Sequence, residues 1–381
     1  MAVTDIQANK KLIKFTQAIN REWVRENMFS PYMSDDVNAI IRRRMELKAG
    51  GEVMNIPLVT RLQGMGVSTG PLVGNEDKID DYGYRIWLEW VRNAVVTTKA
   101  ESQKDSADIF GEAKPLLSDW LSEVTRDEII AALMALPTES QPAAGVRVNG
   151  IQYDLSTAAQ RNTWRLDNVD RILYGAATSN SATDHATSLA NVDATADKFT
   201  AANLSLLKRV AMGANPRIRP YKTRSGYEYY VAFAGLNVFR DLKIDLQVVN
   251  KDARSREGRE VNGAPDNPLF QDGDQIYDGV IVRLVPEISL FVSNVWTSLK
   301  TAGNGGTRVE PVFLCGQQAA AIAYGQMAKP TFRKEDDYGF ITGTGIEAAY
   351  GVGKIFKKHP KAGTKLVQWG VATGFFNSAS D

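Results

Sequence analysis

The chain has 381 residues, of which 44% are hydrophobic, and its 45 basic and 44 acidic residues leave a formal net charge of +1. This length and apolar content allow the cores of two or more lobes and exclude an intrinsically disordered chain. The near-zero charge is not typical of a free nucleic-acid-binding protein, whose basic residues gather on one face. It favours association, because little electrostatic repulsion opposes contact between copies.

The single cysteine and the N-terminus indicate where the protein is made. Cys315 is the only cysteine, so an internal disulfide is excluded and a reducing cytosol is favoured. It lies in the apolar run 312–315, which predicts a buried, unreactive thiol. No apolar segment typical of a secretory signal follows Met1, and no run of about 18 apolar residues predicts a membrane span. We therefore expect a soluble cytosolic product.

The first 51 residues are predicted to form an arm. Residues 5–26 carry apolar side chains at helical spacing, among them Phe15 and Trp23, and a second helix is predicted near 37–47. Both helices precede any predicted strand. We therefore expect an N-terminal arm over 1–51 that is not part of a domain core.

The second predicted helix carries a basic triplet, Arg42, Arg43 and Arg44. Such a cluster is suited to neutralising the phosphates of packaged DNA. Three arginines on one helical turn point in different directions, so salt bridges between subunits explain them equally well. Both interpretations stay open at this point.

An extended hairpin is predicted over residues 52–98. Residues 53–62 follow the period of two that is typical of a strand, with Met54, Ile56 and Leu58 on one side, and Pro57 within the run indicates an edge strand. A glycine-rich tip over 63–74 follows, and residues 84–98 form a second run rich in β-branched and aromatic residues. Arms of about 12 residues would reach about 40 Å at about 3.3 Å per residue.

A two-stranded ribbon is only marginally stable alone in water, so its large side chains need a surface to lie on. We predict that a neighbouring subunit supplies that surface. The candidate interface residues are Gly64, Met65, Gly66, Leu72, Val73, Trp87 and Trp90 on the hairpin, and Phe15 and Trp23 on the arm.

A long helix is predicted over 106–136. Its apolar residues recur along one side, and Pro137 ends it. Pro115 is expected either to kink the helix or to mark the start of its main part. At about 1.5 Å per residue the run would measure roughly 45 Å, which is enough to form the spine of a domain.

The rest of the chain mixes short strands and helices. Residues 138–200 are small and polar and predict loops and short strands, and Thr200 is a predicted helix cap. We predict helices over 200–212, 235–246 and 317–324, and strands over 228–233, 280–285, 291–296, 309–315, 348–356 and 366–376.

The sequence offers little for catalysis. Neither His185, in a polar loop, nor His359 has a neighbouring histidine or cysteine at metal-ligand spacing. A Ser-His-Asp arrangement is not excluded by spacing alone, but no Gly-x-Ser-x-Gly elbow occurs. The glycine pairs of 343–345 and 351–353 resemble incomplete nucleotide-binding loops and are better explained by turns and close strand packing. We expect no catalytic residue, no cofactor and no bound metal.

The order of these elements resembles the Hong Kong 97 fold of tailed-phage major capsid proteins, and the resemblance covers nearly the whole chain. Several stretches are similar to a coat-protein group found in some podoviruses. They are Asn38-Ala39-Ile40-Ile41 through Gly50-Gly51 into Ile56-Pro57-Leu58, Asn267-Pro268-Leu269-Phe270 with Tyr277-Asp278-Gly279-Val280, and Phe313-Leu314-Cys315-Gly316-Gln317-Gln318-Ala319-Ala320-Ala321.

The resemblance implies an α+β fold in which the extended loop lies across a neighbouring subunit. It also implies a division of the chain. The parts are an N-terminal arm at 1–51, the extended β-hairpin loop at 52–98, the peripheral domain with its spine helix at 99–137, the axial domain at 138–310, and a C-terminal return to the peripheral domain at 311–381.

The implied function is that of a structural major capsid protein, not an enzyme. Copies would self-assemble as hexamers and pentamers, in the host bacterial cytoplasm, into an icosahedral virion head around double-stranded DNA. The implied partners are a separate scaffolding protein, a portal and non-specifically contacted DNA, with a decoration protein left open and no membrane. Two alternatives remain, an encapsulin-type compartment shell and a soluble nucleotide-binding enzyme.

Overall fold

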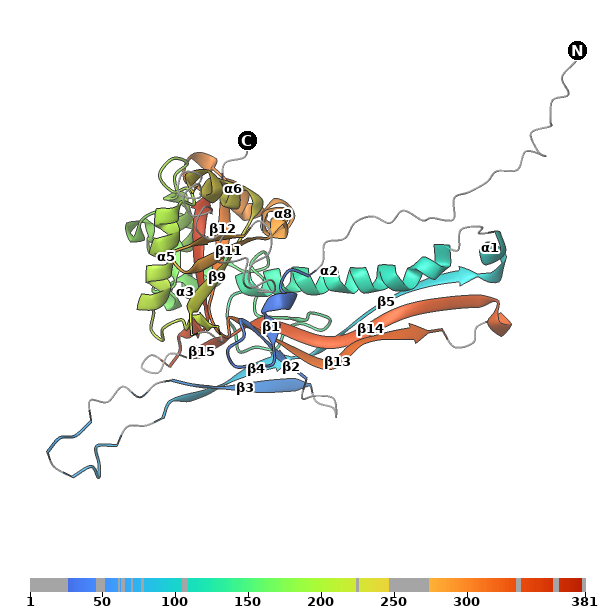
Figure 1. Cartoon of the computed structure of the whole chain (residues 1–381), viewed down its shortest axis with the longest axis horizontal. Helices are drawn as coiled ribbons and strands as arrows, with labels where there is room; N and C mark the ends of the chain where they lie inside the picture. The colour runs from blue at the N-terminus through green and yellow to red at the C-terminus, as the bar shows by residue number, and fades with distance from the viewer. Residues whose placement is uncertain are drawn as a thin grey trace, which may run out of the picture.

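The computed structural model describes residues 27–45, 52–60, 62, 66–69, 71–76, 79–104, 109–223, 226–246, 274–333, 337–358 and 363–378. The molecule is elongated (Figure 1). A rounded lobe lies at one end, a long helix with a sheet runs away from it, and a thin two-stranded ribbon leaves beneath the lobe in the opposite direction.

The first sheet forms the elongated part of the molecule together with helix α2, Ala113–Met134. Its strand order is β1-β2-β13-β14-β5, and β6 pairs with the far end of β14. Helix α2 lies alongside β5 and β14 in Figure 1. The strands are β1 Met33–Ser34, β2 Ile41–Arg44, β5 Glu89–Thr98, β6 Val148–Asn149, β13 Ala320–Phe332 and β14 Ile341–Lys354.

The predicted spine helix is confirmed, but it begins at Ala113 and not at 106. Pro115 lies in its first turn, where a missing backbone N–H costs no intrahelical hydrogen bond, so it marks the start of the helix. At about 1.5 Å per residue the 22 residues of α2 measure about 33 Å. A short helix, α1 Lys99–Lys104, and a 3-10 turn, η4 Ile109–Glu112, precede it.

The second sheet forms the rounded lobe, with the strand order β10-β11-β9-β12-β17-β7 and β8 paired to β9. Its central strands β12 and β17 are buried along their whole length, because helices cover both faces. Its strands are β7 Ile172–Tyr174, β8 Tyr221–Lys222, β9 Glu228–Ala234, β10 Gln275–Tyr277, β11 Val280–Leu284, β12 Val309–Cys315 and β17 Val371–Asn377.

Alternate residues of β9 and β12 point to different hydrophobic clusters. Phe233 and Phe313 belong to the cluster that includes α2 and α8, whereas Ala232 and Leu314 belong to the one beneath α5 and α6. The helices are α3 Ala158–Asp167, α4 His185–Ala190, α5 Ala201–Gly213, α6 Leu236–Asp245 and α8 Pro286–Asn294. The 3-10 turns are η2 Ser30–Tyr32, η5 Thr178–Asn180, η7 Thr297–Thr301, η8 Asn304–Gly306 and η9 Asp337–Gly339.

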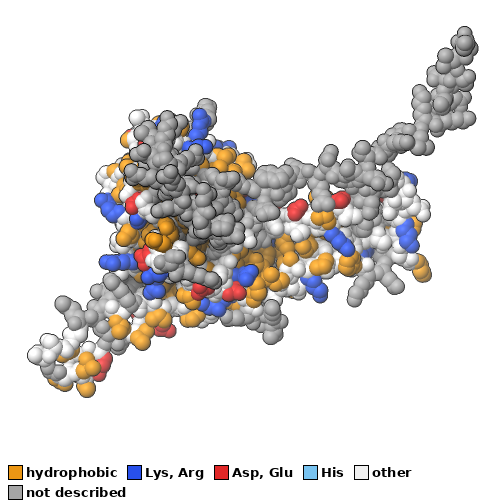
Figure 2. All heavy atoms as spheres, in the orientation of Figure 1, with side chains coloured by type: hydrophobic (Ala, Val, Ile, Leu, Met, Phe, Trp, Pro, Cys, Tyr) orange, Lys and Arg blue, Asp and Glu red, His pale blue; other side chains and the backbone are white. Residues whose placement is uncertain are grey.

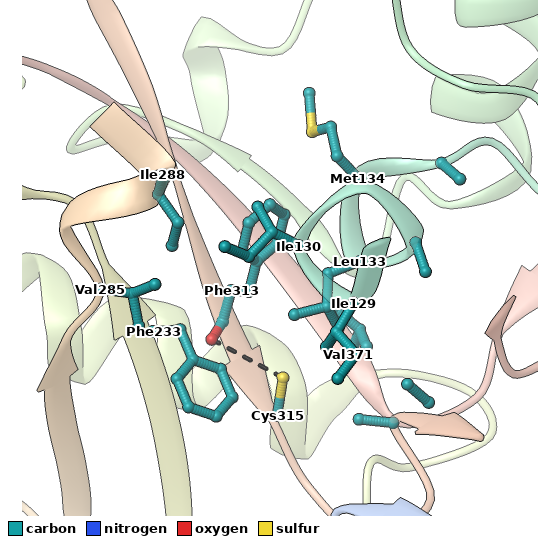
Figure 3. Close-up of a cluster of buried hydrophobic side chains, with 14 of the residues drawn as sticks. Ile129, Ile130, Leu133, Met134, Phe233, Val285, Ile288, Phe313, Cys315 and Val371 are labelled. Atoms are coloured by element: carbon teal, nitrogen blue, oxygen red, sulfur yellow. Dashed lines mark hydrogen bonds between the residues drawn. The ribbon is translucent and has the colours of Figure 1, made fainter. Parts of the chain in front are cut away.

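One continuous core joins the lobe to the spine helix. Figure 3 shows Ile130 and Leu133 of α2 beside Phe313 of β12, with Ile288 of α8 on the other side. Cys315 lies in this cluster, and burial raises the pKa of its thiol. The prediction of a buried cysteine is therefore confirmed, and the thiol stays protonated at neutral pH.

Three predicted elements are wrong. Residues 37–47 contain the strand β2 in place of a helix, residues 317–324 lead into the strand β13, and residues 291–296 largely belong to helix α8. Ala320, Ala321 and Ala323 favour a helix locally, but each is fully buried in a strand between β2 and β14. Intrinsic propensity is a weak signal, and sheet pairing overrides it here.

Other predictions hold. Helix α5 begins after Thr200, whose side chain accepts a hydrogen bond from the backbone N–H of Asn203 at 3.4 Å. Strands β9, β11 and β12 and helix α6 lie where they were expected. The C-terminal strands are β15 Phe356–Lys358, β16 Leu366–Gln368 and β17. Residues 311–381 therefore supply strands to both sheets, since β13 and β14 belong to the first and β17 to the second.

Candidate assembly interface

The predicted hairpin is a two-stranded ribbon of β3, Val53–Val59, and β4, Asp81–Trp87. Side chains of β3 alternate strictly between exposed and buried, as the sequence predicted. The predicted arm length of about 12 residues is wrong, because residues 89–98 form β5 and pair with β14 in the first sheet. Trp90 therefore lies on that sheet and not on the ribbon.

The ribbon finds part of the surface that it needs on its own subunit. Met54, Ile56 and Leu58 pack in one hydrophobic cluster with Ile355 and Phe356. The chain itself therefore covers one face of the ribbon, and coverage of the rest by a neighbouring subunit stays a prediction. The opposite face of β3 and the tip of the ribbon remain exposed in the single chain.

The buried side-chain amide of Asn149 stabilises the junction between the ribbon and the first sheet. The backbone N–H of Trp87 donates to Oδ1 of Asn149 at 2.9 Å, and Nδ2 of Asn149 donates to the carbonyl of Trp87 at 3.1 Å. The side chain thus replaces a strand partner where the chain passes from β4 to β5. Gly351 packs so close to the carbonyl of Trp87 that no Cβ would fit there.

The base of the ribbon is also fixed by charge. Nζ of the buried Lys357 forms an ion pair with Asp80, and Nζ of Lys358 lies 2.7 Å from Oε2 of Glu139. The hydroxyl of Tyr82 donates to Oε1 of Glu139 at 2.9 Å. Partial burial opposes ionisation of Glu139, but the hydrogen bonds from Lys358 and Tyr82 outweigh it and lower the pKa of this carboxyl group. These contacts set the direction in which the ribbon leaves the body.

The predicted interface residues that the structure describes are largely open to solvent. Leu72 is 63% exposed, Val73 is 82% exposed and Trp90 is 52% exposed, whereas Trp87 is half-buried. Gly66 has a φ of 73°, a value that suits glycine. Figure 2 shows hydrophobic side chains at the tip of the ribbon and along the elongated part. Four predicted residues lie outside the described residues, namely Phe15, Trp23, Gly64 and Met65.

The arginine triplet lies on a strand and not on a helical turn. Strand β2 runs parallel to β1 and β13, and Arg42 within it is only 8% exposed. Nε of Arg43 pairs with Oδ1 of Asp35 at 3.2 Å. The prediction that the three arginines lie on one helical turn is therefore wrong. Their contact with DNA or with other subunits stays a prediction.

His185 is a structural residue of the lobe. It begins helix α4, which corrects the predicted loop, and it is nearly fully buried. Its Nε2 lies 3.0 Å from the hydroxyl of Tyr153, and its Nδ1 lies 2.7 Å from that of Tyr174. Burial, with the nearby charges of Arg161 and Arg165, lowers the pKa of His185 to about 3, so the ring is neutral. His359 lies outside the described residues.

The glycine pairs at 343–345 and 351–353 both lie within strand β14. A Cβ on Gly353 would collide with the hydroxyl of Tyr84 and with Asn149, so close packing explains this glycine as predicted. Within the described ranges, no three histidine, cysteine, aspartate or glutamate side chains are grouped to hold a metal ion. Among the described helices, none combines the length and apolarity that crossing a membrane requires.

Sequence reasoning missed the contacts at the base of the ribbon. Asp80 and Lys357 are 277 positions apart, and Asn149 is 62 positions from Trp87. The sequence signals were only an acidic pair at 80–81 and a basic turn at 357–360. Neither pattern indicates which distant residue its charged side chains would contact.

An elongated subunit with an exposed, partly apolar ribbon is typical of a protein that builds a shell from its own copies. The model of one protein family, described as phage capsid protein, matches residues 1–373. The chain belongs to this phage capsid protein family.

Solved structures agree. The capsid protein of cyanophage Pam1 is 34% identical, with a TM-score of 0.85 and full coverage of both chains. The capsid protein of Ralstonia phage GP4 is 17% identical with a TM-score of 0.71, and coverage is 100% of this chain and 99% of that one. The head protein of Helicobacter pylori bacteriophage KHP40 is 14% identical with a TM-score of 0.61, and coverage is 100% and 98%. No curated protein sequence matches the chain.

The predicted fold and function are thereby confirmed. The chain has the α+β Hong Kong 97-like capsid fold, and it is a structural major capsid protein of a phage head shell. Its place is the virion.

Proposed function

We propose that copies of this chain assemble as hexamers and pentamers into an icosahedral head that encloses double-stranded DNA. The observation that carries the proposal is the ribbon, whose tip leaves Leu72 and Val73 largely exposed to solvent. Exposed aliphatic side chains at the end of a fixed arm are costly unless a partner covers them. Assembly takes place in the host bacterial cytoplasm, and the chain acts as a building block without catalysis.

The parts of the chain have distinct tasks in this proposal. The ribbon region, within 52–98, lies across a neighbouring subunit. The spine helix and the first sheet serve as the peripheral domain, and the lobe within 138–310 meets its copies at the centres of hexamers and pentamers as the axial domain. The arm over 1–51 and the strands β13 and β14 of the C-terminal region complete the peripheral domain, whereas β17 contributes to the lobe.

The proposal includes several partners. A separate scaffolding protein and a portal take part in assembly, and DNA is contacted without sequence specificity. Arg42, Arg43 and Arg44 are candidates for that contact or for pairing between subunits. A decoration protein remains open.

The decisive experiment deletes residues 63–75 and images the expressed protein by electron microscopy. The ribbon arms keep their contacts with Phe356 and Lys357, so the deleted chain should stay folded while closed shells are lost. A matched pair of point variants refines the test. Val73→Ser should impair shells, whereas Leu155→Ser, which removes an exposed leucine of the lobe, should not.

Normal shells from the deleted chain would refute the role of the ribbon. Shells that enclose a cargo enzyme in place of DNA, detected by mass spectrometry, would point to an encapsulin-type compartment. A small stable oligomer that binds a nucleotide saturably would point to an enzyme.

A further inference from the structure

A groove with an apolar floor opens on the lobe next to the base of the ribbon. Its volume is about 470 Å³, and it lies between helix α5, the segment 215–220 and Trp369. The floor is formed by side chains with large apolar surfaces. These are Met212, Pro216, Ile218, Tyr230 and Trp369. Met212 is half exposed within it, so the floor is open to a ligand.

The rim of the groove is positively charged. Lys208 and Glu228 line it but already have partners, since Lys208 pairs with Asp278 at 2.9 Å and Glu228 with Lys222 at 3.0 Å. Arg217 and Arg219 line the groove and are exposed, and Arg209 lines an adjoining hollow that shares Met212 and Arg217.

Arg217 and Arg219 in the groove and Arg209 in the adjoining hollow are the positive charges open to an occupant. Among the residues that the structure describes, no carboxylate pairs with the side chains of Arg209, Arg217 or Arg219. An occupant of the groove therefore needs apolar side chains for the floor and a net negative charge for the rim.

We propose that the groove receives the tip of the ribbon of a second copy of this chain. The tip has the required chemistry, because Leu72 and Val73 are its exposed apolar side chains. Glu76 and Asp77 outweigh Lys78 in its charge. The backbone N–H of Gly74 donates to Oε2 of Glu76 at 2.8 Å, which keeps this carboxylate beside the two aliphatic residues.

The subunit's own tip does not occupy its own groove. Thr60, at the base of the ribbon, lines the groove, and from there the ribbon leads its tip away from the lobe (Figure 1). The tip and the groove are thus different surfaces of one chain. Such a head-to-tail contact closes into a ring when the rotation between copies fits a whole number of subunits. The inference rests on the proposed assembly and adds the surface that receives the ribbon.

Nucleic acid is the rival occupant for a basic rim. Phosphates gain nothing from the apolar side chains that form the floor. The combination of floor and rim therefore favours a polypeptide tip with both apolar and acidic side chains.

A cysteine pair tests the contact directly. One batch of the full chain carries Met212→Cys and a second carries Val73→Cys, and the two are co-assembled in equal amounts and oxidised. Because a disulfide needs Cα atoms within about 7 Å, the pair should give about tenfold more cross-linked dimer than a control pair with Ala202→Cys. Ala202 is exposed on the same helix and lies outside the groove. The native Cys315 is buried and stays out of the reaction.

Charge exchange gives an independent readout. Arg217→Glu should lower the yield of shells while the purified subunit keeps its circular dichroism, and adding Glu76→Arg should restore the yield. Restoration by the second change is not expected if Arg217 serves only the fold of its own lobe.

The outcomes separate this inference from the proposed function. Shells that form without cross-linking above the Ala202 control would overturn the groove contact and leave the assembly role intact. A subunit that forms no shells with its scaffolding protein, even with the native sequence, would overturn the assembly role itself. Arg217→Glu shells that form normally but retain less DNA would assign the groove to nucleic acid and overturn the inference.

Discussion

The lobe and the ribbon of this subunit differ in how far a single chain buries the side chains of their strands. In the lobe, strands β12 and β17 lie at the centre of a sheet with helices on both faces, so every residue in them is buried. In the ribbon, β3 pairs with β4 alone among the described strands and buries every second side chain. The strands at the centre of the lobe are covered within one chain, whereas the ribbon leaves half of its β3 side chains exposed. In the proposed assembly another chain covers them. Stability and assembly should therefore respond to different substitutions.

The largest expected effect is in the lobe. Phe313→Ala removes a fully buried ring that packs near Ile130 and Phe233, and should lower the free energy of unfolding by roughly 3–5 kcal/mol. Denaturant titration of the unassembled subunit measures it. As a control, Phe332→Ala on the exposed end of β13 should change stability by less than about 0.5 kcal/mol. Equal losses would contradict the assignment of the core.

A second effect concerns the pH dependence of stability and Lys354, which lies at the end of β14 between helices α2 and α3. Lys354 is buried, with Nζ donating to the carbonyl of Leu133 at 3.0 Å and lying 5.3 Å from the ring of Trp164. Burial lowers the pKa of Lys354 to about 7 from an ordinary value of 10.5. Between these two values the unfolded chain binds more protons than the folded one, so stability should rise with pH across this window.

Lys354→Met should therefore stabilise the subunit most below pH 7, where the native chain must bury the charge in full. The gain should shrink toward pH 10. Thermal unfolding of the native chain and of the variant is measured between pH 6 and pH 10. The difference between their stabilities at each pH removes the contribution of the tyrosines, which both proteins share. A difference that does not change with pH would contradict the shifted pKa.

A smaller effect is expected where the ribbon meets the body. Asp80→Ala leaves the ammonium group of the buried Lys357 without its carboxylate and should cost about 2 kcal/mol. Hydrogen exchange should increase in β3 and β4 before it increases in β12. Uniform protection across the two regions would mean that the ribbon and the lobe unfold as one unit.

The smallest effect is at Glu139. Its carboxyl group is largely exposed, so Glu139→Gln should cost less than about 1 kcal/mol at neutral pH. Because the folded chain lowers the pKa of Glu139, its contribution is complete above the ordinary value of 4.5 and is lost as the pH falls below it. The native chain and the variant should therefore differ at pH 7 and converge in acid, which urea titrations at both pH values measure.

Much of the architecture follows from local patterns. The alternation over 53–59, the apolar stripe of α2 and the cap at Thr200 each depend on neighbours within a few residues, and each is confirmed. The helix predicted over 317–324 is wrong because its alanines pair in a strand with β14, which is distant in the sequence. The predicted ribbon arm is too long for the same reason. It ends at Trp87, where the side chain of the distant residue Asn149 binds the backbone.

The sequence alone determined that this chain builds a spine helix, an exposed glycine-rich hairpin and a set of short strands in the order of a capsid subunit. Hydrophobic periodicity and turn residues act over short distances, so they can be read without a structure. Only the tertiary structure decided that β5 leaves the ribbon, that Asp80 meets Lys357 and that an apolar groove lies beside the ribbon's base. These features bring together residues that are far apart in the chain. Their contacts stabilise the fold only after the strands between them have paired.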